Sequence, residues 1–285
     1  MMDGLRKDEG PTIKKLPIEA DIPEYLVALA LQRNATDEEQ AVADLIQLAF
    51  FFLLRVGEYT MKGSRNETKQ TVQFRRKDIT FFKKNAQGKL QQLPRTASDE
   101  DIMAADGVTL KLTNQKNGWK NVCLHHHSNE HPVHNPTRAA ARRYIYSRNN
   151  FVDDNTELSA YIEHSCRCDV TDVHIRKALK NAGAQLNYPQ NNGIPIDRID
   201  THSLRAGGAN ALHLSGYSDR EIQKMGRWRG DTFKEYISDN LHNFSEGMSK
   251  AMSKCFNFVN IAGGVFHDIT NVAINTPYLA NASTA

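Results

Sequence analysis

The sequence of 285 residues has few cysteines, no long apolar segment and little net charge. Its four cysteines, at positions 123, 166, 168 and 255, show no spacing typical of a disulfide framework, which favours a reducing compartment. No secretory signal is visible, and the apolar run LIQLAFFFLL is too short to span a bilayer and is followed by an arginine. We therefore expect an intracellular protein with no membrane span, nuclear in a eukaryotic host and otherwise in the cytoplasm or nucleoid.

The positive charge is unevenly distributed along the chain. The 36 basic and 33 acidic side chains nearly balance, so the overall charge does not identify a nucleic-acid-binding protein. Residues 62–95, however, hold ten lysines or arginines against two acidic residues, and residues 138–148 add four arginines. Such clusters are typical of a surface that binds a phosphate backbone, but acidic neighbours in space, such as those at 99–106, would make an ordinary solvated face. The candidate DNA contacts are Arg75, Arg76, Lys77, Arg142, Arg143, Arg227 and Arg229.

The first half of the chain combines a helix with strands. Thr36 and Glu39 match a capping box, which predicts the start of a long apolar helix that runs through Leu54. Strand-like runs follow in VQFRRKDITFF, VTLKLT and WKNVCLH, and the last two flank NQKNG. Because Asn-Gly tolerates positive φ at both positions, this segment predicts a hairpin with Lys116 at its tip.

The second half has a mainly helical pattern. Asn135 and Pro136 predict a helix N-terminus, and further helices are expected from Thr171 to near Gly183 and across THSLRAGGANALHLSG, which ends at Gly216. A second capping box, formed by Ser218 and Glu221, and a last short helix in DTFKEYISDNL follow. We therefore expect an α+β fold, mostly helical, with one small antiparallel sheet.

Two histidine-containing segments raise the question of a metal site. HHHSNEHPVH lies close to Cys123, but the spacing matches no structural zinc pattern, and we interpret it as a polar loop before the arginine-rich helix. Cys166 and Cys168 lie near His164, but this Cys-x-Cys has no second half, and we interpret it as a loop too. The sequence predicts no metal ion and no other cofactor.

Six further polar residues would be costly to bury without a purpose. They are Arg55, Lys116, His202, Arg205, Trp228 and Tyr236. Together these residue types suit attack on a phosphodiester, because arginine binds the non-bridging oxygens and stabilises the charge of the transition state. A tyrosine hydroxyl can act as nucleophile if a histidine accepts its proton, and a lysine can protonate the leaving 5′ oxygen.

Four sequence blocks occur in an informative order. LLRVGEY, NQKNG, HSLRAGGAN and GRWRGDTFKEYI resemble the catalytic domain of tyrosine recombinases, the phage integrase superfamily, especially those encoded by eukaryotic mobile elements. The resemblance covers about residues 5 to 245. It implies a linker-like tail at 1–16, a catalytic domain at 17–246 and a C-terminal tail at 247–285.

The resemblance implies a role for each residue in these blocks. Arg55 and Arg205 would clamp the scissile phosphate, with Glu58 as a supporting residue and Trp228 in contact with the phosphate. Lys116 would be the general acid, although Lys111 and Lys120 share its hairpin. His202 would manage the proton of Tyr236, and Tyr236 would form a 3′-phosphotyrosyl bond with DNA. Gly207 and Gly208 would let neighbouring backbone pack behind the phosphate pocket.

The resemblance further implies a site-specific recombinase or integrase that binds double-stranded DNA, self-associates on it as a tetramer and needs no cofactor. Trp228 and Tyr236 are eight residues apart, one fewer than the family pattern leads us to expect. Arg55 also comes too early for the usual N-terminal helical domain to precede it. The alternatives are a type IB topoisomerase and a non-catalytic DNA-binding remnant of a mobile element.

Overall fold

The computed structural model describes residues 15–61, 71–114, 120–129, 131–230 and 234. The chain divides into two compact units, Met1–Ser238 and Asp239–Ala285, and all described residues lie in the first. Its α-helices are α1 (Asp21–Ala30), α2 (Asp37–Phe51), α3 (Val56–Tyr59), α4 (Asp99–Met103), α5 (Pro136–Asn150), α6 (Asp172–Gln185), α7 (Tyr188–Asn191), α8 (Thr201–Leu214) and α9 (Asp219–Gly226). Its strands are β1 (Ile79–Lys84), β2 (Leu90–Gln92), β3 (Gly107–Asn114), β4 (Lys120–His127), β5 (Ala160–Glu163) and β6 (Cys166–Asp169).

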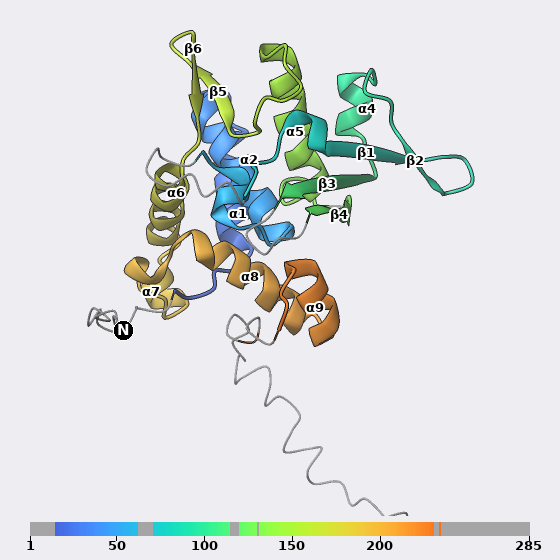
Figure 1. The fold of residues 1–285 in the computed structure, drawn as a ribbon. Helices are drawn as coiled ribbons and strands as arrows, with labels where there is room; N and C mark the ends of the chain where they lie inside the picture. Colours follow the sequence, from blue (N-terminus) through green and yellow to red (C-terminus); the bar gives the residue numbers. More distant parts are fainter. Residues whose placement is uncertain (1–14, 62–70, 115–119, 130, 231–233, 235–285) are drawn as a thin grey trace, which may run out of the picture. The chain divides into compact units, whose positions relative to one another are not determined.

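The strands form a small antiparallel sheet and a separate hairpin. The sheet has the order β2-β1-β3-β4, and β5 pairs with β6. Figure 1 shows the sheet on one side of α2, with α6 and α7 on the other side. This arrangement confirms the predicted α+β fold, mostly helical with a small antiparallel sheet.

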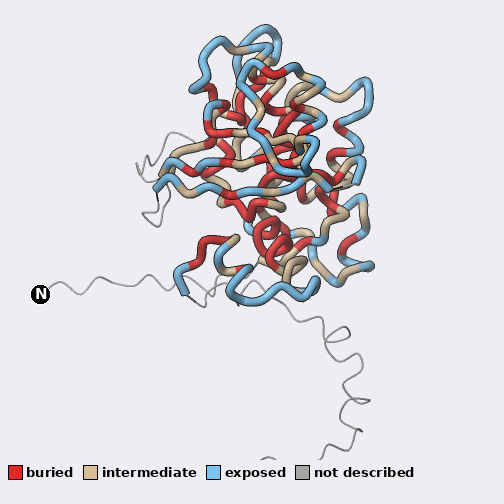
Figure 2. The backbone as a smooth tube through the Cα atoms, turned by 90° about the vertical axis from the view of Figure 1, so that its right-hand side faces the viewer, coloured by how far each residue is buried: buried red, intermediate tan, exposed pale blue. Residues whose placement is uncertain are grey.

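Helix α2 is the centre of the described unit. It packs against α1, α5, α6, α8 and β5, and its residues from Ala41 to Phe50 are all buried. Figure 2 shows the buried backbone running through the interior, with exposed loops around it. The predicted capping box is present, because Thr36 Oγ1 accepts from the Glu39 amide and Glu39 accepts from the Thr36 amide. The helix ends at Phe51, three residues before the expected end at Leu54, because Leu53 has a φ of 48° and leaves the helical path.

The predicted β3–β4 hairpin is confirmed as far as the structure describes it. Asn114 pairs with Lys120 at the last described position, and Lys116 at the tip lies outside the described residues. The run VQFRRKDITFF forms a strand only from Ile79 onward. Before it, residues 76–78 form one 3-10 turn because the Asp78 carboxylate accepts from the Arg75 amide at 3.0 Å.

Two segments that we interpreted as loops lie partly in strands, although the residues described after His127 are not part of a strand. His125 to His127 belong to β4, where His126 pairs with Val108, and Cys166 and Cys168 belong to β6. The β5–β6 hairpin is possible because both residues of its turn, His164 and Ser165, adopt positive φ. In the part of the chain that the structure describes, no three His, Cys, Asp or Glu side chains gather to hold a metal ion. No helix there has the length and apolar character needed to cross a bilayer.

The predicted helix ends in the second half are largely confirmed. Asn135 accepts from the amides of Thr137 and Arg138 at the start of α5, and Ser218 begins α9 with the predicted capping box. Helix α8 ends before Gly216, which has a φ of 83°. Helix α6 continues to Gln185, two residues beyond the expected end. The last predicted helix, DTFKEYISDNL, falls almost entirely outside the described residues.

Gly207 and Gly208 allow two backbone segments to lie directly against α8. A Cβ atom on Gly207 would overlap the carbonyl oxygen of Ile18, in the segment before α1. A Cβ atom on Gly208 would overlap the carbonyl oxygen of Phe50, in the last turn of α2. Gly207 therefore lets the segment before α1 lie against α8, and Gly208 lets α2 pack closely on α8, as the sequence predicted for neighbouring backbone.

We expect Gly207→Ala to destabilise the protein. Alanine normally gains about 1 kcal/mol over glycine inside a helix, but here the new methyl group meets rigid backbone, and overpacking of this kind costs about 1–3 kcal/mol. The urea midpoint should fall relative to the wild type. Gly230→Ala is the matched control, since nothing lies within 4 Å of its added Cβ. Equal midpoints for the two variants would contradict the close approach.

Candidate active site

The chain segment after α2 turns one carbonyl toward two arginines. Leu53 has left-handed backbone geometry, and its carbonyl oxygen accepts from Arg205 Nη1 and from Arg227 Nη2, the latter at 2.9 Å. Arg205 comes from α8, and Arg227 directly follows α9. The end of α2 is thus joined to Arg205 and Arg227, which lie 152 and 174 residues after Leu53 in the sequence.

Glu58 connects Arg55 to the same group. Its carboxylate accepts from the Arg55 amide at 2.9 Å, and Arg55 Nη1 lies 3.5 Å from Glu58 Oε1. Arg227 Nη1 donates to both carboxylate oxygens of Glu58, at 3.0 and 3.1 Å. Glu58 is fully buried, and it therefore binds two arginines inside the protein.

Arg205 and Trp228 form the other half of the cluster. Arg205 Nη2 donates to the Gly226 carbonyl, and its guanidinium carbon lies 4.2 Å from the centre of the Trp228 ring. Only 2% of Arg205 and 8% of Trp228 are exposed, and the indole packs in an apolar cluster with Leu53 and Ile222. The ring therefore covers a buried cation and holds it by a cation–π contact.

The cluster brings several charged groups close together. Arg55 and Arg227 pair with the carboxylate of Glu58, and Arg205 donates to the same Leu53 carbonyl as Arg227. Burial lowers the pKa of Arg227 from its usual value, and the charge of Glu58 opposes this shift. Since electrostatic interactions are stronger where water is excluded, arginines fixed in such a cluster suit binding of an anion such as a phosphodiester.

His202 lies on the first turn of α8 and is exposed, three residues before Arg205 on the same helix. The helix starts there because the Asp200 carboxylate accepts from the Thr201 amide at 2.6 Å. Lys116 and Tyr236 both lie outside the described residues. Among the predicted catalytic residues, Arg55, Arg205 and Trp228 thus lie together in the structure. His202 is exposed on the first turn of α8, the helix that also carries Arg205.

Three of the predicted DNA contacts are internal, and we correct their assignment. Arg76 is buried and donates to Asp154 Oδ1 at 2.7 Å and to three backbone carbonyls. Arg143 is buried and donates to the carbonyls of Leu158 and Ala160. Arg227 is also buried, and it donates to Glu58 and to the Leu53 carbonyl. The guanidinium groups of these three arginines donate to groups of the protein itself, and we therefore assign them to its interior.

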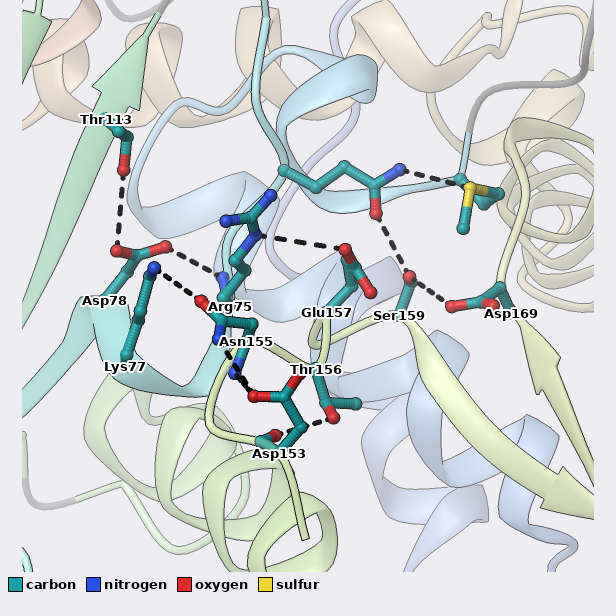
Figure 3. A network of polar contacts seen from close by, with 12 residues as sticks. Arg75, Lys77, Asp78, Thr113, Asp153, Asn155, Thr156, Glu157, Ser159 and Asp169 are labelled. Carbon is teal, nitrogen blue, oxygen red and sulfur yellow. Dashed lines mark hydrogen bonds and ion pairs between the residues drawn. The ribbon is translucent and has the colours of Figure 1, made fainter. Parts of the chain in front are cut away.

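The other predicted contacts lie nearer the surface, and Arg75 and Arg142 have partners of opposite charge. Figure 3 shows Arg75 near Glu157, at 3.9 Å, and Lys77 near Asn155, at 2.5 Å. Arg142 pairs with the buried Asp44 at 2.5 Å, and Arg229 is exposed. The acidic neighbours that the sequence left open as an alternative are therefore present.

Acidic residues at 99–106 also pair with basic residues of the two clusters. Lys83 Nζ lies 2.7 Å from Asp101 Oδ1, and Arg148 pairs with Asp99. Both basic clusters are thus partly neutralised within the described unit, and a DNA-binding surface would depend on the partly exposed cations that remain.

Sequence reasoning missed three supports of this site. The Leu53 carbonyl and the inward-facing Arg227 depend on backbone geometry that the sequence does not reveal. The third is His126, whose ring lies against Phe52 and whose Nε2 donates to the Phe51 carbonyl at 2.8 Å. Burial lowers the pKa of His126 to about 4, so the ring is neutral at pH 7 and braces the end of α2 just before Leu53.

No family model matches the chain, and no curated protein matches it. Solved structures found by similarity of fold include XerA recombinase, with 13% identity, a TM-score of 0.47, and coverage of 88% of this chain and 68% of that chain. XerH site-specific recombinase bound to its difH substrate has 13% identity and a TM-score of 0.47, and the match covers 86% of this chain and 56% of that chain. The Tn1549 transposon integrase in complex with transposon right end DNA has 11% identity and a TM-score of 0.40, and the match covers 88% of this chain and 69% of that chain. The interpretation of the site therefore rests on its own geometry and on the four sequence blocks.

Proposed function

We propose that this chain breaks and rejoins DNA strands as a site-specific recombinase or integrase of a mobile element, through a covalent 3′-phosphotyrosine intermediate. The observation that supports this most directly is the buried cluster in which the Leu53 carbonyl and Glu58 join Arg55, Arg205 and Trp228. These residues come from sequence blocks far apart in the chain, and their meeting at one place favours a site over unrelated surface residues.

The reaction balances without a metal or ATP. The Tyr236 oxygen attacks phosphorus and forms the phosphotyrosyl bond, while the bond from phosphorus to the 5′ oxygen breaks. The tyrosine proton passes to His202, and Lys116 gives a proton to the departing oxygen. Arg55 and Arg205 stabilise the charge on the non-bridging oxygens, and attack by a 5′ hydroxyl on the phosphotyrosine reverses the sequence of steps.

We also propose that the protein assembles on double-stranded DNA as a tetramer, with partly exposed cations such as Arg75, Lys77 and Arg229 near the phosphate backbone. Binding that depends on such contacts weakens steeply as the salt concentration rises.

The decisive experiment uses a nicked suicide DNA that loses the strand needed for religation. Incubated with the protein in EDTA, this DNA should yield a covalent protein–DNA adduct on a denaturing gel, because arginines supply the charge that a metal would otherwise provide. A strict need for Mg²⁺ in cleavage would contradict the assignment. Binding without any adduct would favour the non-catalytic remnant, and relaxation of supercoils without strand exchange would favour a type IB topoisomerase.

A further inference from the structure

Arg227 adopts a backbone conformation that does not suit an arginine. It ends α9 with φ 59° and ψ 39°, in the left-handed region where helices usually carry glycine. A residue with a side chain is strained in this region. Because glycine would make the same turn at lower cost, the guanidinium group itself is the feature that accounts for an arginine here.

The partner of this arginine has the same unusual backbone. Leu53 has a φ of 48°, and its carbonyl oxygen accepts from Arg227 Nη2 at 2.9 Å. Two non-glycine residues in left-handed conformation therefore meet at one hydrogen bond. Such strain persists only where the surroundings impose it, and it tends to gather at functional sites. The Leu53 carbonyl also accepts from Arg205, so this bond bears on the placement of Arg205.

Arg227 also limits the pairing of Glu58 with Arg55. Arg227 Nη1 and Nη2 lie 3.0–3.1 Å from the Glu58 carboxylate, whereas Arg55 Nη1 lies 3.5 Å from it. Without Arg227, the buried carboxylate would keep Arg55 as a cationic partner and would draw its guanidinium group closer than 3.5 Å. Arg55 would then bind Glu58 and would no longer be placed to bind an anion.

From these contacts we propose that Arg227 is a positioning residue. It holds Glu58 and the Leu53 carbonyl at once, and it thereby sets the separation of Arg55 and Arg205 and leaves the Arg55 guanidinium available to the scissile phosphate. The inference rests on the proposed function and assigns Arg227 to the interior of the site instead of to the DNA surface.

The test compares Arg227→Gly, which keeps the left-handed turn and removes the guanidinium, with the wild type. We expect the first-order rate of adduct formation at saturating suicide DNA to fall about 100-fold, since a displacement of about 1 Å in an active site costs that much. The Kd for DNA should change little. Arg227→Lys keeps the charge, but one ammonium group cannot hold both acceptors in the same geometry, so the rate should recover only in part. Arg220→Gln, which replaces an exposed arginine of α9, is the control and should react as the wild type does.

A double variant separates positioning from folding. Arg227→Gly leaves Glu58 buried with a weaker partner and lowers stability, whereas Glu58→Gln combined with Arg227→Gly removes both charges and should recover much of the urea midpoint. The adduct rate of the double variant should stay low. A wild-type rate in the double variant, or a loss confined to the Kd for DNA, would overturn the inference.

Binding of orthovanadate without DNA distinguishes failure of this inference from failure of the proposed function. Followed by vanadium NMR, the wild type should bind the anion, and both Arg55→Ala and Arg227→Gly should bind it more weakly. Vanadate binding with this dependence but no adduct would leave the role of Arg227 supported and reject the DNA chemistry. Equal binding by the wild type and Arg227→Gly would reject the positioning role.

Discussion

Tyr236→Phe should abolish the covalent adduct with suicide DNA and leave DNA binding nearly unchanged. The substitution removes one hydroxyl oxygen, which is the atom proposed to attack phosphorus, and phenylalanine has nothing to replace it. The measurement is the fraction of labelled DNA that migrates with the protein on a denaturing gel, together with the Kd from a filter-binding titration.

The matched control for this prediction is Tyr217→Phe. Tyr217 is another tyrosine of the C-terminal half, it is half exposed, and it has no part in the proposed chemistry. That variant should form the adduct at the wild-type rate. An adduct from Tyr236→Phe at the wild-type level would remove Tyr236 as the nucleophile and would direct the search to another hydroxyl group.

The parts of the fold that the sequence predicted well are those set by local physical chemistry. Capping boxes act within four residues, so Thr36 and Ser218 located the starts of α2 and α9 correctly. The β3–β4 hairpin was found because alternation and an Asn-Gly turn are also local signals. The paired glycines of α8 indicated a close neighbour, although the neighbours themselves, Ile18 and Phe50, could not be read from the sequence.

The errors arose where tertiary contacts decide the outcome. The sequence gives a run of basic residues at 75–77, but it does not reveal that the loop at 153–157 comes beside it and binds Arg76 through Asp154. Burial of Arg143 depends in the same way on carbonyls of β5 and of the residues before it. A charge cluster in sequence therefore predicted a DNA surface more broadly than the folded chain supports.

In the candidate site too, the sequence predicted the residues that form the site better than it predicted their tertiary contacts. The residue types and their order identified Arg55, Arg205 and Trp228 as a set, and the structure places them together. Glu58 was expected as a supporting residue, but the Leu53 carbonyl was not predictable as an acceptor, because it points at the arginines only through a positive φ. The expected helix ran through Leu54, because the apolar pattern continues past Phe51 and does not reveal the turn at Leu53.

Lys116→Ala should slow DNA cleavage by roughly 10² to 10⁴, the usual contribution of general acid catalysis. A 5′ alkoxide is a poor leaving group, so the departing oxygen needs a proton as its bond to phosphorus breaks. Strands β3 and β4 flank the segment that contains Lys116, and the tip of a hairpin can enter a DNA groove and bring an ammonium group beside that oxygen.

Replacement of the bridging 5′ oxygen by sulfur tests this role without further change to the protein. A thiolate leaves without a proton, so Lys116→Ala should cleave the sulfur-containing DNA at nearly the wild-type rate while remaining slow on ordinary DNA. Lys111→Ala and Lys120→Ala are matched controls, because both lysines are exposed on the same hairpin. If Lys116→Ala is equally slow on both DNAs and one of these two is rescued by sulfur instead, that lysine is the general acid and the hairpin presents a different residue to the leaving group.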